Sequence, residues 1–155
     1  MKNILITKLN DVMPKHKKEH KDYEYFKREL VPRSQSDKCV VSVYEVPPGK
    51  SAYPYHYHTQ NEECFYILAG MGTLKTPQGD KAVAAGDFIY FPANEESAHK
   101  LMNTSETETL VYLDFDTKNT IDVAFYPDSG KVGIWGEDTN QVYKLSDSVD
   151  YYEGE

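Results

Sequence analysis

Two histidines and a glutamate within the stretch from Gly49 to Gly70 are the residues whose types and spacing point to chemistry. His56 and His58 lie two positions apart, and because side chains alternate across an extended segment, both imidazoles leave the same face. Glu63 follows a short polar segment and precedes an apolar run that ends at Gly70. A strand, a turn and a second strand would return its carboxylate to the imidazoles. That donor set suits Zn, Fe, Mn or Ni better than Ca or Mg.

A fourth candidate ligand, His99, lies in a second stretch that runs from Gly86 to Asn103. Gly86 and the residue after it are typical of a turn, and the apolar residues 88–91 indicate a short buried strand. A loop over 92–98 follows, and we expect His99 to open another strand.

Together the two stretches resemble the two motifs of the cupin superfamily. The matching residues are His56, His58, Glu63 and Gly70 in the first motif and Gly86, Pro92, His99 and Asn103 in the second. Asn94 replaces a motif glycine, which is mild because Asn tolerates left-handed backbone conformations, and the loop from there to His99 is two residues longer than the motif. The resemblance covers the middle third to half of the chain. It implies an all-β fold, a cupin-type double-stranded β-helix (jelly-roll barrel), with one divalent transition metal per subunit on His56, His58, Glu63 and His99.

Alternation decides between the two adjacent glutamates. Glu63 is in phase with Phe65 and Ile67, whereas Glu62 is in phase with Cys64, so with the motif spacing Glu63 is favoured as the ligand. Glu62 is interpreted as a solvated surface carboxylate, and it could shuttle protons only if a turn distorts the strand.

The same argument predicts the surroundings of the metal. The in-phase residues expected to line a substrate pocket are Phe65, Ile67, Leu101 and Asn103. They suggest a modest, largely uncharged ligand, and no inward Arg or Lys is evident to hold a phosphate. Tyr53, Tyr55 and Tyr57 alternate with the histidines, so we expect them to face away from the metal and to pack under a second sheet or at a homodimer interface.

Short strands at near-regular spacing indicate an antiparallel sandwich or barrel in the rest of the chain. They are expected at 40–46, 71–76, 81–85, 109–115, 121–126, 131–135 and 141–145. We divide the chain into an N-terminal charged arm or edge segment (1–38), a cupin core (39–116), C-terminal strands that complete or flank the barrel (117–146) and an acidic tail (147–155).

The N-terminal arm contains two further histidines, His16 and His20, four residues apart. Residues 4–9 could form a short edge strand. His16 and His20 could hold a metal on one face of a helix, but no carboxylate or thiol is fixed near them. We therefore interpret residues 11–30 as a solvated helical or irregular arm.

Composition excludes several classes of protein. The 155 residues carry a net charge of −8 with an isoelectric point near 5.1, which argues against a nucleic-acid or anionic-membrane surface. No apolar run approaches the roughly 18 residues of a membrane helix, so we expect a cytoplasmic protein. Cys39 and Cys64 lack metal-site or disulfide spacing and suit reduced thiols.

Four protein ligands leave one or two metal positions open for water, dioxygen or a bidentate oxygen-containing substrate. The first hypothesis is a small-molecule metalloenzyme, either a dioxygenase or a non-redox isomerase or decarboxylase. The alternative is a binding or sensing module that holds a small ligand without turnover. A metal-free sugar-nucleotide-modifying cupin is disfavoured because the ligand set is intact. No Ser or Cys has a paired base, so the metal would carry the reaction.

Overall fold

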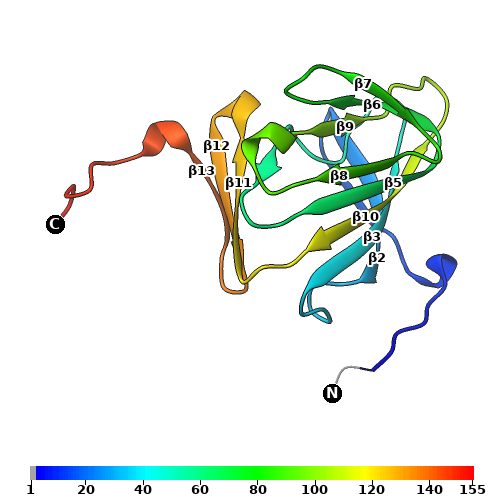
Figure 1. Cartoon of the computed structure of the whole chain (residues 1–155), viewed down its shortest axis with the longest axis horizontal. Helices are drawn as coiled ribbons and strands as arrows, with labels where there is room; N and C mark the ends of the chain where they lie inside the picture. Colours follow the sequence, from blue (N-terminus) through cyan, green and yellow to red (C-terminus); the bar gives the residue numbers. More distant parts are fainter. Residues whose placement is uncertain (1–2) are drawn as a thin grey trace.

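Three antiparallel sheets make up the protein, seen in a computed structural model that describes residues 3–155, apart from the side chain of Glu19 (Figure 1). The strands, in chain order, are β1 (Lys15–His20), β2 (Tyr23–Val31), β3 (Cys39–Val46), β4 (Tyr57–His58), β5 (Glu63–Ala69), β6 (Met71–Lys75), β7 (Lys81–Ala84), β8 (Phe88–Phe91), β9 (Lys100–Met102), β10 (Leu110–Thr117), β11 (Ile121–Tyr126), β12 (Lys131–Gly136) and β13 (Asn140–Lys144). Four short 3-10 turns are η1 (Leu9–Asp11), η2 (Glu95–Ser97), η3 (Pro127–Ser129) and η4 (Leu145–Asp147).

The sheet order is that of a double-stranded β-helix. The six-stranded sheet runs β1-β2-β3-β10-β5-β8, so β10 inserts between two strands that precede it by many residues. A three-stranded sheet, β7-β6-β9, faces it, and a four-stranded sheet, β13-β12-β11-β4, lies to one side (Figure 1). This confirms the all-β cupin-type fold that the motifs predict, and it brings the two motif stretches together.

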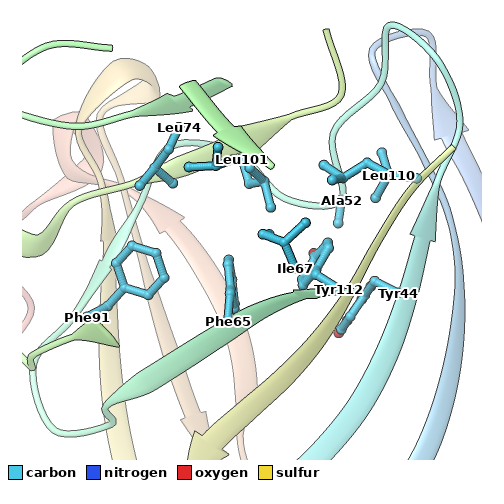
Figure 2. Packing of buried hydrophobic residues seen from close by; sticks show 11 residues of the cluster. Tyr44, Ala52, Phe65, Ile67, Leu74, Phe91, Leu101, Leu110 and Tyr112 are labelled. Atoms are coloured by element: carbon cyan, nitrogen blue, oxygen red, sulfur yellow. The ribbon is translucent and has the colours of Figure 1, made fainter. Parts of the chain in front are cut away.

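Inward-facing side chains of the two barrel sheets form one apolar core (Figure 2). Ile67 of β5 and Leu110 of β10 are completely buried. Tyr44 of β3 stacks on Tyr112 of β10 with ring centroids 5.1 Å apart, and Leu101 of β9 closes the core from the opposite sheet. Each fully buried large side chain contributes on the order of 1.5–3 kcal/mol, so these residues hold the barrel closed.

Two loop positions show what the motif residues do for the backbone. Gly70 adopts a φ of +78°, and a Cβ there would lie 2.5 Å from the Thr109 carbonyl oxygen. Only glycine fits such a turn. Asn94 has a φ of −164°, which is extended backbone that any residue adopts, so the missing motif glycine carries no backbone cost at this position.

The N-terminal segment differs from the expectation. Residues 15–20 and 23–31 form β1 and β2 and extend the six-stranded sheet, rather than a helical or irregular arm. Charged side chains are tolerated there because they pair across strands, as Arg28 does with Glu45 of β3. Aromatic residues alternate with them, and Tyr25 packs against Tyr44 at a centroid distance of 5.4 Å.

At the two ends of the chain, one prediction fails and one agrees with the structure. The short edge strand expected over 4–9 is absent, and residues 9–11 form η1 instead. Residues 1–2 of the predicted arm lie outside the described part of the chain. Beyond η4 the side chains of the acidic tail are exposed, with Tyr151 at 87%.

Candidate metal centre

The four candidate ligands lie at one end of the barrel. His56 and His99 are cross-strand neighbours whose backbones exchange hydrogen bonds of 3.1 and 2.8 Å. His58 lies on β4, which pairs with β11 of the four-stranded sheet. Glu63 is the first residue of β5, where it pairs with Asp116 of β10. Three separate stretches of backbone pairing thus position the four candidate ligands, and His56 and His99 share one of them.

Their donor atoms converge. One ligand atom each from His56, His58 and Glu63 lies within 4.8 Å of the others. The Oε2 atom of Glu63 is 3.2 Å from His99 Nε2 and 3.9 Å from His56 Nε2, and its Oε1 atom is 3.7 Å from His58 Nε2. His99 is therefore adjacent to the tighter three-residue group through Glu63. The alternation argument that paired His56 with His58 and selected Glu63 agrees with this geometry.

Each imidazole presents its Nε2 atom to the centre because its Nδ1 atom is engaged elsewhere. His56 Nδ1 is 2.8 Å from the Pro54 carbonyl, and His99 Nδ1 is 3.0 Å from the Ser97 carbonyl. His58 Nδ1 hydrogen-bonds a carboxylate oxygen of Asp122. Because carbonyl and carboxylate oxygens only accept, each Nδ1 carries the proton and each Nε2 offers a lone pair.

These residues fit a divalent transition ion. Glu63 Oε2 and His99 Nε2 are buried and have no hydrogen-bond partner among the described residues, although they face each other. Native proteins rarely leave such atoms unsatisfied. Three unprotonated imidazole nitrogens and one carboxylate are a donor set for Zn, Fe, Mn or Ni. The geometry selects no one metal among them.

The pKa shifts of His56 and Glu63 agree with ligand roles; burial acts to lower the pKa of His58, but the hydrogen bond to Asp122 and the charge of Glu63 outweigh it and raise that pKa. Burial lowers the pKa of His56 to about 4, so this imidazole is neutral near pH 7. Burial alone would raise the pKa of Glu63, but the neighbouring histidines outweigh it and hold that pKa well below its usual value. A neutral imidazole beside an anionic carboxylate is the state that binds a metal ion.

A cavity of about 210 Å³ opens beside these ligands. Its wall includes His56, His58 and Glu63, and two cationic side chains, Lys27 and Arg33, also line it. The remaining lining residues are Tyr44, Tyr53, Asn61, Asp114, Asp116, Tyr126 and Trp135. The expectation that no Arg or Lys faces the site is therefore wrong. Lys27 comes from β2, in the stretch 11–30 that was interpreted as a solvated arm. Arg33 lies in the loop after β2, in the rest of the N-terminal arm or edge segment (1–38).

Two carboxyl groups, buried Asp114 and half-buried Asp116, also line this cavity. Asp114 and Asp116 lie on β10 in phase with Glu63, and their oxygens lie within 4.8 Å of a Glu63 oxygen. The Oδ1 atoms of both have no hydrogen-bond partner among the described residues. Burial, then the neighbouring carboxylates, raises both pKa values, that of Asp116 to about 7. The sequence pattern did not single out this pair, although the two acids share the phase of one strand face.

The residues expected to line the substrate pocket lie deeper. Ile67 and Leu101 belong to the apolar core. Asn103 donates 2.8 Å hydrogen bonds to the carbonyls of Val46 and Glu108 and thereby joins two loops. Phe65 packs edge-on against the His99 ring, 5.6 Å between centroids. None of the four lines the cavity, because facing inward does not place a residue at the open end of the barrel.

The tyrosines do not share one outward face. Tyr53 lines the cavity, with its ring 6.4 Å from that of His56 and its hydroxyl 2.8 Å from the hydroxyl of Tyr44. Tyr55 and Tyr57 line a separate hollow of about 450 Å³ on the far side of Tyr126. The alternation argument fails for Tyr53 because residues 52–56 are not a strand.

The remaining candidates lie away from the centre. His16 pairs with Glu24 at 3.1 Å and stacks on Phe26. Exposed Glu62 accepts a 2.7 Å hydrogen bond from the Tyr90 hydroxyl. Both cysteines are free thiols. Within residues 3–155, no helix has the length and apolar character to cross a membrane.

The comparisons with known proteins agree with this arrangement. Residues 42–116, which include all four ligands, match the family model of the cupin domain. No curated protein matches the chain in sequence. A solved structure from Acidithiobacillus ferrooxidans, described as a putative sugar phosphate isomerase, is 27% identical with a TM-score of 0.82, and the match covers 96% of this chain and 97% of that one.

Two other solved structures share the fold at lower identity. A sugar phosphate isomerase of the cupin superfamily from Silicibacter pomeroyi is 17% identical with a TM-score of 0.82, covering 93% of this chain and 95% of that one. A predicted oxalate decarboxylase from Thermotoga maritima is 21% identical with a TM-score of 0.63, covering 74% and 100%. The likenesses to the Acidithiobacillus ferrooxidans and Silicibacter pomeroyi structures extend well beyond residues 42–116 at both ends. With its double-stranded β-helix, its family match and its His/Glu centre, the chain belongs to the cupin superfamily.

Proposed function

We propose that this protein is a metal-dependent isomerase that acts on a phosphorylated sugar. The observation that carries the proposal is the composition of one cavity, which joins the His/Glu centre to two cations and two carboxyl groups. The 27% identical protein from Acidithiobacillus ferrooxidans, similar over nearly its whole length, is named for that activity.

Each part of the cavity matches a part of such a substrate. Lys27 and Arg33 offer positive charge for a phosphate group, and the guanidinium can bind it through two parallel hydrogen bonds. Tyr126 and Trp135 provide aromatic surface for the C–H faces of a sugar. The unpartnered oxygens of Asp114 and Asp116 can accept hydrogen bonds from hydroxyl groups. The expected largely uncharged ligand does not match this lining.

Isomerisation of a hydroxy-carbonyl compound moves a proton from the hydroxyl-bearing carbon to the neighbouring carbonyl carbon, and a second proton from the hydroxyl oxygen to the carbonyl oxygen. A divalent ion bound at the centre would supply Lewis-acid polarisation of the carbonyl oxygen and the adjacent hydroxyl. Asp116 lines the same cavity and its pKa is raised to about 7, so its carboxylate can receive the proton that leaves the first carbon and return it to the second. No net oxidation occurs, and no co-substrate is needed.

The test is a metal reconstitution series. The protein is stripped with a chelator, reloaded separately with Zn, Mn, Fe(II), Ni or Co, and mixed with aldose and ketose phosphates in deuterated water. Interconversion and deuterium incorporation at the carbon beside the carbonyl are followed by NMR. We expect turnover with at least one metal and none with the stripped protein.

A matched variant tests the phosphate assignment. Arg33→Ala is expected to raise KM for the phosphorylated sugar about tenfold, the equivalent of ~1.4 kcal/mol, with a smaller change for the unphosphorylated sugar. Lys38→Ala, an exposed cation outside the cavity lining, is the control. Saturable binding of the sugar phosphate without turnover under every metal would contradict the isomerase and favour the binding or sensing module.

A further inference from the structure

A single buried carboxylate on β11 holds two parts of the metal centre. Asp122 is only 1% exposed. Its Oδ2 atom accepts a hydrogen bond from His58 Nδ1, and its Oδ1 atom accepts bonds of 2.9 and 3.2 Å from the backbone N–H groups of Gln60 and Asn61. One side chain thus contacts a ligand and the loop that leads to the next ligand, Glu63.

The rest of the same segment supports that loop. Thr59 N donates to the Val123 carbonyl at 2.9 Å, and Asn119 Nδ2 donates to the Gln60 carbonyl and to Asn61 Oδ1. Residues 117–123 therefore form a hydrogen-bonded support for residues 59–62. A short loop held at both ends by such bonds has few alternative conformations, so the position of Glu63 follows from it.

Strand β11 also faces the other ligands. Ala124 pairs with His58, and the Tyr126 ring stacks on His56 at 5.8 Å with an interplanar angle of 20°. Asp122, Ala124 and Tyr126 alternate and so share the face of β11 that is turned to the site. This strand lies outside residues 42–116, the part matched by the family model.

The three imidazoles are not supported alike. The Nδ1 atoms of His56 and His99 meet backbone carbonyls, whereas that of His58 meets a carboxylate. A carboxylate partner fixes the tautomer and makes the imidazole a stronger donor to a metal, and its loss costs 10–100-fold in affinity in proteins where it has been removed.

We propose that Asp122 is the positioning residue of this metal centre: it orients His58 with Nε2 toward the ion and fixes the loop that delivers Glu63. The role concerns metal binding and does not depend on which reaction the protein catalyses. Asp122 thus gives β11 a role in a site whose candidate ligands all lie within residues 42–116.

The test compares Asp122→Asn with the unmodified protein in metal affinity. Zn²⁺ affinity is measured by competition with a chromophoric chelator, and the Co²⁺ form is examined by electronic absorption. We expect Zn²⁺ affinity to fall about 10–100-fold, with altered Co²⁺ bands. Asp128→Asn, an exposed carboxylate after β11 that pairs with Lys75, should leave both unchanged. Equal affinity and identical bands in Asp122→Asn would overturn the proposal.

A measurement on the unmodified protein keeps the proposal testable if Asp122→Asn does not fold. Long-range ¹H–¹⁵N NMR of the zinc-loaded protein reports which ring nitrogen of each histidine carries a proton. We expect His58 to carry it on Nδ1, with the most downfield of the three site resonances because a carboxylate accepts it. A proton on Nε2 of His58, or rapid exchange of its Nδ1 proton with solvent, would overturn the role of Asp122.

A separate observation concerns the outer face of the six-stranded sheet. Tyr66 and Leu68 of β5, Phe88 and Tyr90 of β8, and Phe115 of β10 are 39–65% exposed on that face. Tyr66 is directly opposite Phe88, and Cys64 lies between Tyr90 and Phe115. The outward positions of β5 and β8 carry no charge, although the Glu62 carboxylate borders them at Tyr90. In a chain whose net charge is −8, an uncharged face limits the repulsion that a like-charged copy meets.

We infer that a second copy of this chain packs on this face. At ~200 Å² for each large side chain, the exposed parts amount to roughly 500 Å² of apolar surface per copy. Two copies would bury about 1,000 Å², close to the two-thirds apolar share of a standard 1,600 Å² homodimer interface. The homodimer expected from the sequence is thereby placed on β5, β8 and β10 rather than on Tyr53, Tyr55 and Tyr57.

Light scattering after gel filtration tests the inferred dimer. At micromolar concentration we expect about twice the chain mass of 17.8 kDa. Tyr66→Asp with Phe88→Asp should give the single-chain mass, whereas Ile121→Asp, an exposed apolar residue of the four-stranded sheet, should not. A monomeric unmodified protein, or a dimer that persists in the double variant, would overturn the inference.

Discussion

Side chains at both ends of the barrel point into its interior, but those at one end line the candidate metal site and those at the other form the apolar core. Along β5 the inward side chains pass from Glu63 through Phe65 to Ile67, and along β10 they pass from Asp116 and Asp114 to the apolar core. At one end the inward groups are ligands and acids that line a cavity. At the other they are apolar and completely covered. Alternation therefore tells which face a residue occupies, whereas depth along the strand decides whether it can meet a ligand.

The apolar end should dominate stability. Ile67→Ala removes a completely buried side chain and is expected to lower the free energy of unfolding by about 2–5 kcal/mol, measured by urea denaturation. Leu68→Ala, the next residue on the outward face at 43% exposure, should cost less than ~1 kcal/mol. Similar losses for the two variants would contradict the assignment of the core to this end.

The polar end should respond to pH instead. Asp116→Asn is expected to stabilise the metal-free protein more at pH 7.5 than at pH 4.5, by a difference on the order of 1–3 kcal/mol. Urea denaturation in the presence of a chelator, at several pH values, measures it. Asp80→Asn, in an exposed turn before β7, is the control and should show no such trend.

The sign follows from the raised pKa of Asp116, about 7 in the folded protein against an ordinary 3.8. Below pH 3.8 both states hold the proton. Between about 4 and 7 the unfolded chain has released it and the folded protein keeps it, so the free energy of unfolding falls as the pH rises. Asn has no proton to lose, so the free energy of unfolding of the variant does not fall in this way. A variant whose advantage shrinks toward pH 7.5 would contradict a carboxylate-lined cavity.

The smallest effect is expected at a histidine outside the centre. His16→Ala on β1 removes an exposed pair with Glu24 and a ring contact with Phe26, so unfolding should change by less than ~1 kcal/mol. Its metal content should equal that of the unmodified protein, measured by elemental analysis. Loss of bound metal in this variant would show that the cation lies at the N-terminal histidines rather than in the barrel.

The candidate ligands could be predicted from sequence because their chemistry, spacing and phase agree. Alternation paired His56 with His58, phase together with the motif spacing selected Glu63, and the second motif supplied His99. The strands of the core were predicted for the same reason, since their apolar residues have the period of a strand.

What the sequence did not indicate depends on long-range pairing. β1 and β2 are rich in charge; β2 acquires its strand pairing from β3 and β1 from β2, which no local pattern reveals. Arg33 and Lys27 reach the cavity only because that pairing places them there. Asp122 is separated by 64 residues from the histidine that it contacts. Alternation shows that Asp114 and Asp116 share one face of a strand, but two acids in a strand are equally typical of a solvated face.

The most direct test of the central account is the metal content of the unmodified protein and its ligand variants. The stripped protein is equilibrated with an equimolar mixture of Mn, Fe(II), Ni and Zn under anaerobic conditions, desalted and measured by elemental analysis. The account predicts about one ion in total per chain, retained in His16→Ala and lost in His99→Ala and Glu63→Gln, with all four proteins folded by circular dichroism. Unchanged metal content in folded His99→Ala and Glu63→Gln, or no bound ion in the unmodified protein, would contradict it.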